Sequence, residues 1–470
     1  MSTLVQIAQY VPTVRDPERE QKLKQMLIWT GIVLLLYFAM SEIPLWTAGA
    51  ENADTAVESL RTFETLLGSS TGTLITLGIG PIVTASIVLQ MLVGSELLSW
   101  NTDSQEGKQK FQAAQKLLAY GLTVIQAAGF AFSGTFGPPT EIIGSIAGIS
   151  IPVGLLLTLQ MSIGGWLIIL LDDLIQKWGF GSGVGLFIAA GVSKAIFVQL
   201  FSPLTDTGAL YFMSGGDPQG AFFTFITTLA PEAALTIVST VIVFAVCVYL
   251  QAMRVEIPLT FGNVRGFGQK WPLKFFYTSV MPVIFVSALT ANVQIIGTVL
   301  AGQNGSVPIL GTFSQGQPQS GLALLLNPPS NFLSTLITGG FGSITSFQVG
   351  HALFYVTFYT VGAAIFSIFW ARTTGQDSDA VAEQIQDTGM KVPGFRKDKR
   401  VIKKVLERYI PPLVVVAGAS VGFIAAITNL SGAASSGTSI LLVVMILYRL
   451  YEQLAQKHME ELHPALKDFF

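Results

Sequence analysis

The sequence predicts an all-α polytopic membrane protein with ten transmembrane helices. Of its 470 residues, 51% are hydrophobic and only 11% are charged, whereas soluble domains carry about 25% charged residues. The charges are also unevenly spread, because residues 275–371 contain no Asp, Glu, Lys or Arg. Apolar stretches long enough to cross a bilayer recur along the whole chain. Most of the surface is therefore expected to face lipid.

Each predicted span is mostly apolar, since about 20 such residues are needed to cross about 30 Å of hydrocarbon. We expect the fourth span, which is long, to be tilted or broken at Pro152, whereas the fifth is short and contains Lys194. The ten spans are 27–46, 72–94, 111–133, 143–171, 184–201, 233–253, 273–297, 346–371, 411–430 and 436–454.

Basic residues orient these spans, because cytoplasmic loops carry an excess of Lys and Arg. With the N-terminus inside, every Lys and Arg except Arg61 and Lys194 falls on the inside. We therefore expect both termini to be cytoplasmic, and two large basic cytoplasmic loops at 254–272 and 372–410.

The spans divide the chain into two halves of five. Gly78-Ile79-Gly80-Pro81 interrupts the second span and Met281-Pro282 the seventh, which is the second of its half. Paired interruptions of this kind are typical of inverted repeats, although proline is also common in ordinary spans. The expected regions are an N-terminal cytoplasmic segment, an N-terminal half, an external connector, a C-terminal half and a cytoplasmic tail: 1–26, 27–201, 202–232, 233–454 and 455–470.

Ionisable residues that mark pumps and coupled transporters are nearly absent from the spans. Lys194 lies deeper than the others, but a single lysine is a poor proton relay. One cysteine, three histidines and the absence of a catalytic triad or paired acid/base carboxylates predict no metal, no cofactor and no enzyme. The remaining ionisable residues lie near span ends, where snorkelling is the expected role: Glu42, Lys116, Asp172, Asp173, Glu232, Lys274, Arg449 and Glu452.

The run from Gly181 to Gly185 (GSGVG) superficially resembles a phosphate-binding loop. It follows a membrane span rather than a strand, and no P-loop lysine follows it, so the nucleotide interpretation fails. We interpret the glycines as a short cytoplasmic turn that enters the fifth span.

The large basic loops fit two kinds of partner, anionic lipid or nucleic-acid phosphate. Arg265 and Arg396 lie far from the span ends, which favours docking on a large polyanion. Residues 58–67 carry apolar side chains at helical spacing but are too few to cross a bilayer. This segment is either an interfacial helix or a half-helix that folds back into a cavity.

Five motifs lie in order along the chain: LITLGIGPIVTA at 74–85, GSGVGLFIAAG at 181–191, MRVEIPL at 253–259, RYIPP at 408–412 and YRLYEQ at 448–453. Together they resemble the archaeal SecY family, the alpha subunit of the Sec protein translocon and a relative of the alpha subunit of the eukaryotic endoplasmic-reticulum translocon. The resemblance runs from about Lys22 to the C-terminus.

The resemblance implies a protein-conducting channel in the cell (plasma) membrane, with two pseudo-symmetric inverted five-helix halves around a central pore. It implies a constriction of six aliphatic side chains, namely Ile79, Val83, Val184, Ile188, Ile284 and Leu442. It implies a lateral gate with polar positions Thr84, Gln126 and Asn292. It also implies a plug at about 58–70 with the residues Leu60, Arg61, Phe63, Leu66 and Leu67.

The implied partners are a SecE-like gamma subunit, a small beta subunit, membrane lipids, signal sequences, nascent polypeptides and, indirectly, the signal recognition particle pathway. The ribosome is a further partner, whose RNA would meet Arg265 and Arg396. The chain departs from the family in having valine at position 184, four extra residues before the plug, and Lys194, to which the family assigns no role.

Two rival functions stay open at this point. A small-molecule secondary transporter with inverted repeats would place carboxylates near mid-membrane. A membrane insertase without a through-pore would leave the crossing of secreted proteins unaffected.

Overall fold

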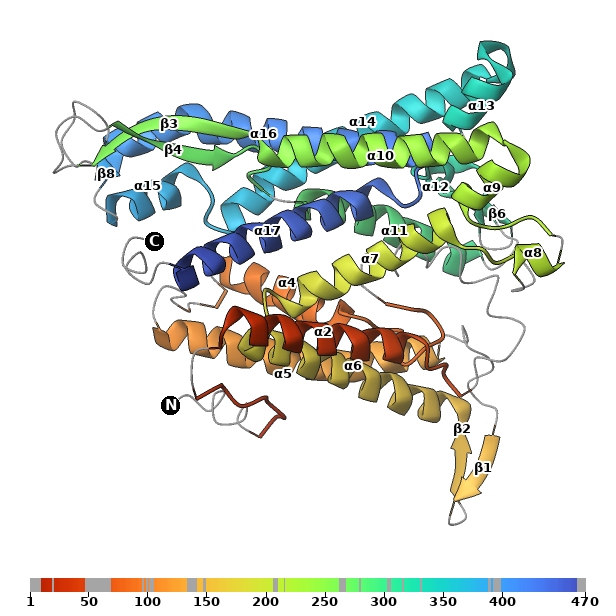
Figure 1. Cartoon of the computed structure of the whole chain (residues 1–470), viewed down its shortest axis with the longest axis horizontal. Helices are drawn as coiled ribbons and strands as arrows, with labels where there is room; N and C mark the ends of the chain where they lie inside the picture. Colours follow the sequence, from red (N-terminus) through yellow and green to blue (C-terminus); the bar gives the residue numbers. More distant parts are fainter. Residues whose placement is uncertain are drawn as a thin grey trace. The chain divides into compact units, whose positions relative to one another are not determined.

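The computed structural model is predominantly helical (Figure 1). The chain divides into two compact units, residues 1–193 with 446–470 and residues 194–445. Among the described residues, seven helices are both long and apolar enough to cross a membrane. The structure describes residues 10–18, 21–46, 69–94, 97–98, 100, 105–132, 142–146, 149–205, 210–214, 216–261, 268–278, 280–301, 306–314, 317–329, 332–387, 390–391 and 399–462.

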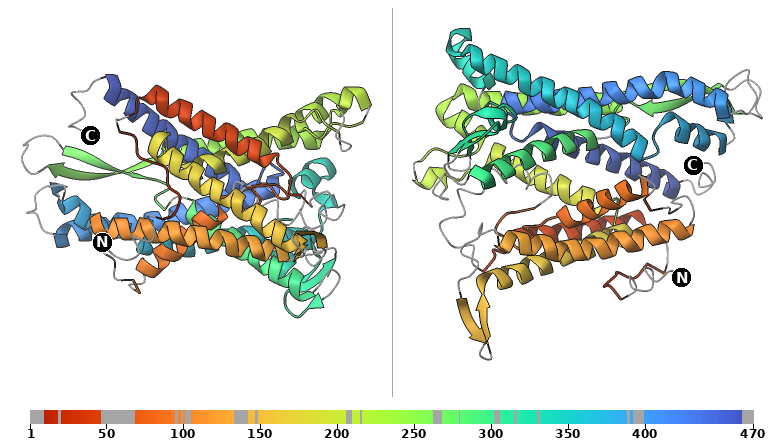
Figure 2. Two further views of the ribbon diagram at one scale, coloured as in Figure 1. Left: turned by 90° about the horizontal axis from the view of Figure 1, so that it is seen from below. Right: turned by 180° about the vertical axis from the view of Figure 1, so that it is seen from behind.

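The first unit is built on helices that pack side by side. The α5 helix contacts both α4 and α6, and α2 contacts α6. The β1–β2 hairpin precedes α6 and projects beyond the start of that helix (Figures 1 and 2). The elements are α2 (Leu23–Ser41), α4 (Gly80–Gly94), α5 (Gln105–Phe132), β1 (Ile142–Ile146), β2 (Ile149–Pro152) and α6 (Val153–Trp178). Two further helices, α7 (Gly183–Phe201) and α17 (Gly437–Leu462), have one part in each unit.

The second unit has α14 packed against α16 as its central feature. A Cβ at Gly418 or Gly422 of α16 would collide with α14, at Ser367 and at the Tyr359 carbonyl respectively. The Ser367 hydroxyl donates to the Val414 carbonyl at 2.7 Å. In membranes, small residues let two helices approach closely, and Ser or Thr hydroxyls can then hydrogen-bond across the contact. The helices are α10 (Pro231–Ala252), α11 (Met281–Ala301), α14 (Ser346–Thr373) and α16 (Lys399–Ser431).

Two groups of smaller elements connect these helices. A three-stranded sheet of order β4-β3-β8 and helix α15 lie at one end of the unit (Figure 1), and a sheet of order β5-β6-β7 packs against α11. The elements of the first group are β3 (Arg254–Phe261), β4 (Gly268–Lys274), α15 (Ser378–Asp387) and β8 (Met390–Lys391). The others are α8 (Tyr211–Ser214), α9 (Ala221–Thr228), β5 (Ser306–Val307), β6 (Gly311–Ser314), β7 (Gln317–Pro318), α12 (Gly321–Leu325), α13 (Phe332–Gly339) and the 3₁₀ helix η1 (Phe341–Ser343).

A helix occupies every predicted span, but some boundaries were wrong. The fourth span was predicted from residue 143, yet α6 begins at Val153 because the β1–β2 hairpin fills the preceding residues. Pro152 marks that break, as expected. The predicted interruptions of spans 2 and 7 are instead helix starts, since Pro81 and Pro282 are each the second residue of α4 and α11. Proline suits the first turn because the N–H groups there have no partner in the helix.

Candidate functional site

The first pair of candidate constriction residues lies where the chain enters α4. Residues 71–79 form turns, Gly78 has a φ of +52°, and the helix starts immediately afterwards. Ile79 is fully buried and Val83 is half-buried. The Val83 N–H donates to the Ile79 carbonyl at 3.0 Å. The two side chains therefore lie one turn apart on the same side of the helix start.

The second pair lies on the first turns of α7. Gly181 has a φ of +84°, a conformation that favours glycine, and it turns the chain into this helix. The interpretation of the glycine run as a tight turn into the span is therefore confirmed. Val184 is half-buried and Ile188 is buried, four residues apart and hence on one helix face.

The third pair lies in the second unit, on α11 and α17. The Ser287 and Thr438 hydroxyls are hydrogen-bonded at 3.2 Å, which joins the second turn of α11 to the first turn of α17. Ile284 precedes Ser287 by about one turn, and Leu442 follows Thr438 by about one turn. Ile284 is half-buried and Leu442 is buried. The structure thus places the six residues as three aliphatic pairs at helix starts, and their closure into one ring stays a prediction.

The candidate gate residues are only partly described. The Thr84 hydroxyl donates to the Gly80 carbonyl of its own helix at 2.8 Å. Gln126 is half-buried on α5, which contacts α4, so the two residues lie on neighbouring helices. The side chain of Asn292, on α11, lies outside the described residues.

Residues 58–68 of the predicted plug and the two candidate ribosome contacts, Arg265 and Arg396, also lie outside the described residues. The predicted plug residues are Leu60, Arg61, Phe63, Leu66 and Leu67.

The strands that precede the two arginines in the sequence are described. Backbone pairing between these strands connects one basic loop to the other. Strand β3 pairs with β4 along its length. It also pairs with β8, through Thr260 with Lys391 and Phe261 with Met390. The segment that carries Arg265 follows β3 directly, and the segment that carries Arg396 follows β8 directly. Sequence reasoning treated the loops as separate, because a two-residue strand leaves no readable pattern.

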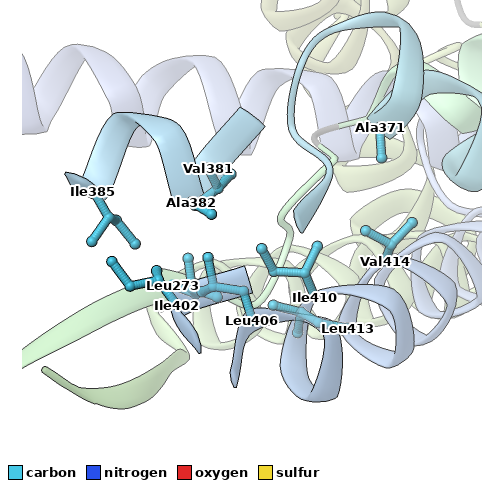
Figure 3. Close-up of a cluster of buried hydrophobic side chains, with 10 residues drawn as sticks. All are labelled: Leu273, Ala371, Val381, Ala382, Ile385, Ile402, Leu406, Ile410, Leu413 and Val414. Carbon is cyan, nitrogen blue, oxygen red and sulfur yellow. The ribbon is translucent and has the colours of Figure 1, made fainter. Parts of the chain in front are cut away.

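A buried apolar cluster supports this sheet. Helix α15 lies along the first part of α16, with the side chains of both directed toward one another (Figure 3). An exposed ion pair joins the same helices, with 2.6 Å between Lys403 Nζ and Asp379 Oδ2. The cluster consists of Leu273, Ala371, Val381, Ala382, Ile385, Ile402, Leu406, Ile410, Leu413 and Val414.

A hydrogen bond ties the connection before α11 to the connection after α14. The Tyr277 hydroxyl donates to the Gln376 carbonyl at 2.9 Å. Burial, together with the nearby Asp377 carboxylate, raises the pKa of Tyr277 to about 12. The phenol therefore stays protonated near neutral pH and remains a donor.

In the first unit, the N-terminal segment is fastened to α5 and α6. The Val14 N–H donates to Asp173 Oδ2 at 2.8 Å. Lys116 Nζ lies 3.1 Å from the same oxygen. The Trp178 indole N–H donates to the Arg15 carbonyl at 2.8 Å. Asp173, near the end of α6, therefore ties an extended segment to α6 and α5.

The prediction that Asp172 snorkels at a span end was wrong. Its side chain is buried, and its carboxylate accepts hydrogen bonds from the Val184 and Gly183 N–H groups and from the Gln176 amide. A buried carboxylate is tolerated only when it is hydrogen-bonded in this way. The available signal was an acidic residue shortly before a glycine-rich turn, which suits the exposed N–H groups of a helix start.

Comparison with known proteins identifies the family. The family model described as SecY matches residues 73–451. The protein translocase subunit SecY of Methanocaldococcus jannaschii is 40% identical over 472 residues, which cover 99% of each chain. The chain belongs to the SecY family. The protein translocase subunit SecY of Haloarcula marismortui is 39% identical to this chain. The match covers 98% of this chain and 97% of the Haloarcula protein.

Solved structures agree with this SecY assignment. A structure described as a protein conducting channel matches with a TM-score of 0.76 and 39% identity, over 99% of this chain and 100% of that one. Sec61 in the canine ribosome-channel complex matches with a TM-score of 0.73 and 39% identity, over the same shares. This SecY-family chain is therefore a multi-pass membrane protein with the ten-helix, pseudo-symmetric fold of those channels, as the sequence predicts.

Proposed function

We propose that the chain is the central pore-forming subunit of a Sec translocon. It conducts unfolded polypeptides across the membrane and releases hydrophobic segments sideways into the bilayer. The observation that carries this proposal is similarity along the full length to translocase SecY subunits and to a protein-conducting channel. None of the comparisons favours a small-molecule transporter.

The pore mechanism follows from the three aliphatic pairs at the starts of α4, α7, α11 and α17. We propose that they converge into one collar. A narrow apolar constriction excludes ions because water leaves it. The same collar offers no charge or amide that would hold a passing segment, so both polar and apolar sequences slide through. Valine rather than isoleucine at position 184 makes the collar slightly wider.

Closure and lateral release are proposed for two further groups. The plug, about 58–70, closes the outer side of the collar. The gate lies between α4–α5 and α11–α14, with Thr84, Gln126 and Asn292 at its polar positions. Hydrogen bonds between membrane helices average only about 0.6 kcal/mol. A gate closed by bonds of that strength opens readily when a signal sequence binds.

The ribosome is the proposed docking partner of the two basic loops, with Arg265 and Arg396 against ribosomal RNA. Two observations support this proposal: a similar channel is seen in a ribosome complex, and the described strands of the two loops, β3 and β8, pair with each other beside an apolar cluster. The translating ribosome then supplies the driving force, and the chain is not itself an enzyme. SecE-like and beta-type subunits complete the complex, and signal recognition particle delivers clients indirectly.

The proposed setting is the plasma membrane, with both termini in the cytoplasm. Depletion of the chain tests the function. Secreted precursors should accumulate inside the cell, and new membrane proteins should fail to insert. Secreted proteins that cross normally would indicate an insertase without a pore. Solute uptake driven by a pH or sodium gradient in vesicles that contain only this complex would indicate a transporter.

A further inference from the structure

The turn between α6 and α7 is organised by one buried carboxylate. The side chain of Asp172, two turns before the end of α6, is only 7% exposed. Its Oδ1 accepts the Val184 N–H at 3.0 Å, and the Gly183 N–H also donates to the carboxylate. Its Oδ2 accepts the Gln176 side-chain amide at 2.8 Å. The first two N–H groups of α7 thus bond to a side chain of the preceding helix rather than to one of their own.

The distance between α6 and the start of α7 is also fixed at this contact. A Cβ built on Gly183 would lie 2.5 Å from Asp172 Oδ1 and 2.7 Å from Asp172 Cα. No larger residue fits there without moving one helix, so the start of α7 lies directly against α6. A negative charge at this place also suits the positive end of the α7 dipole. Charge-assisted hydrogen bonds are stronger and more directional than neutral ones.

The anchored residue is itself a candidate constriction residue. Val184 supplies the N–H that Asp172 holds, and Ile188 lies one turn further along the same face. We propose that Asp172 is a positioning residue, which sets the place of Val184 and Ile188 in the closed collar by holding the first turn of α7 against α6. This inference rests on the proposed collar, to which it adds a support that sequence reasoning missed.

The next residue gives a matched control. Asp173 also has a largely buried carboxylate. This carboxylate accepts a hydrogen bond from the Val14 N–H and forms an ion pair with Lys116, away from the start of α7. An Asp173→Asn change removes the same charge one position along. It should loosen the N-terminal segment without moving the collar.

The test is the resting ion conductance of the complete complex in planar bilayers, with its thermal unfolding temperature measured in parallel. Asp172→Ala removes all acceptors for the two N–H groups, so conductance should rise by about tenfold, as expected for the loss of a charged hydrogen-bond acceptor. Asp172→Asn keeps one acceptor oxygen for Val184 and should give a smaller rise. Asp173→Asn should stay within about twofold of the parent, the usual range for changes away from a critical contact.

An Ile188→Gly variant separates the possible failures. If Ile188→Gly conducts ions but both Asp172 variants stay closed in a folded complex, the positioning role is wrong and the collar stands. If Ile188→Gly also stays closed, the collar itself is wrong, and the positioning role falls with it. Equal leakage from the Asp172 and Asp173 variants would overturn the inference. A complex that fails to assemble even with Asp172→Asn would do so as well, because the carboxylate would then be a general requirement of folding.

Discussion

Replacing Ile385 with alanine tests whether the apolar cluster holds α15, and through it the basic loops. Ile385 is fully buried and points toward α16 (Figure 3). At about 0.8 kcal/mol per buried methylene, the lost carbons cost about 2.4 kcal/mol. The cavity that remains brings the total to about 3 kcal/mol. Helix α15 has ten residues, too few to stay helical without packing, so this cost falls mainly on its docking.

Hydrogen exchange of residues 378–387, followed by mass spectrometry on the intact complex, measures the docking directly. A loss of about 3 kcal/mol should speed exchange by about 100-fold where exchange proceeds through undocking. The matched control is Gln384→Ala, an exposed position of the same helix, which should change exchange by about twofold or less. Because α15 also contacts β8, ribosome affinity should fall in Ile385→Ala alone. Exchange that matches the parent in Ile385→Ala would refute the role of the cluster.

Three further predictions concern the proposed collar, loops and gate. Replacing Ile79 and Ile188 together with glycine should raise the resting ion conductance of the reconstituted channel, because a wider and less apolar constriction stays wet; unchanged conductance would count against the collar. Arg265→Glu should weaken ribosome binding, with a shallower dependence on salt because fewer phosphates are neutralised; equal affinity across a salt titration would exclude this loop. Cysteines at Thr84 and Asn292 should crosslink in the idle channel but not with a signal sequence bound, and a crosslink that persists in both states would reject the gate.

Continuous apolar length predicts the existence of the spanning helices, but it does not predict where they begin. The run from residue 142 to Pro152 is as apolar as a membrane-spanning helix. A short apolar run does not by itself indicate whether it forms a strand or a helix. Likewise, the segment before Met281 is apolar enough to extend the predicted span, yet it forms strand and turns. Proline was the informative residue in both places.

The early start of α16 was readable but was hidden by its charges. Ile402, Leu406 and Ile410 recur every four residues and form one buried stripe, the spacing of an amphipathic helix. Hydropathy alone placed the span after this basic region.

Asp172 was missed for a related reason. Its position near a span end suggests solvation, and only the fold brings the start of α7 onto its oxygens.

Photo-crosslinking of a stalled nascent chain shows whether a polypeptide passes through the aliphatic collar. Crosslinkers are placed at Ile79, Ile188 and Ile284, with an exposed position of α10, Val241, as the control. We expect a secretory chain threaded from the ribosome to crosslink at all three aliphatic positions and not at the control. Crosslinks at the control alone, or at none of the four positions while the chain is being translocated, would contradict passage through an aliphatic collar.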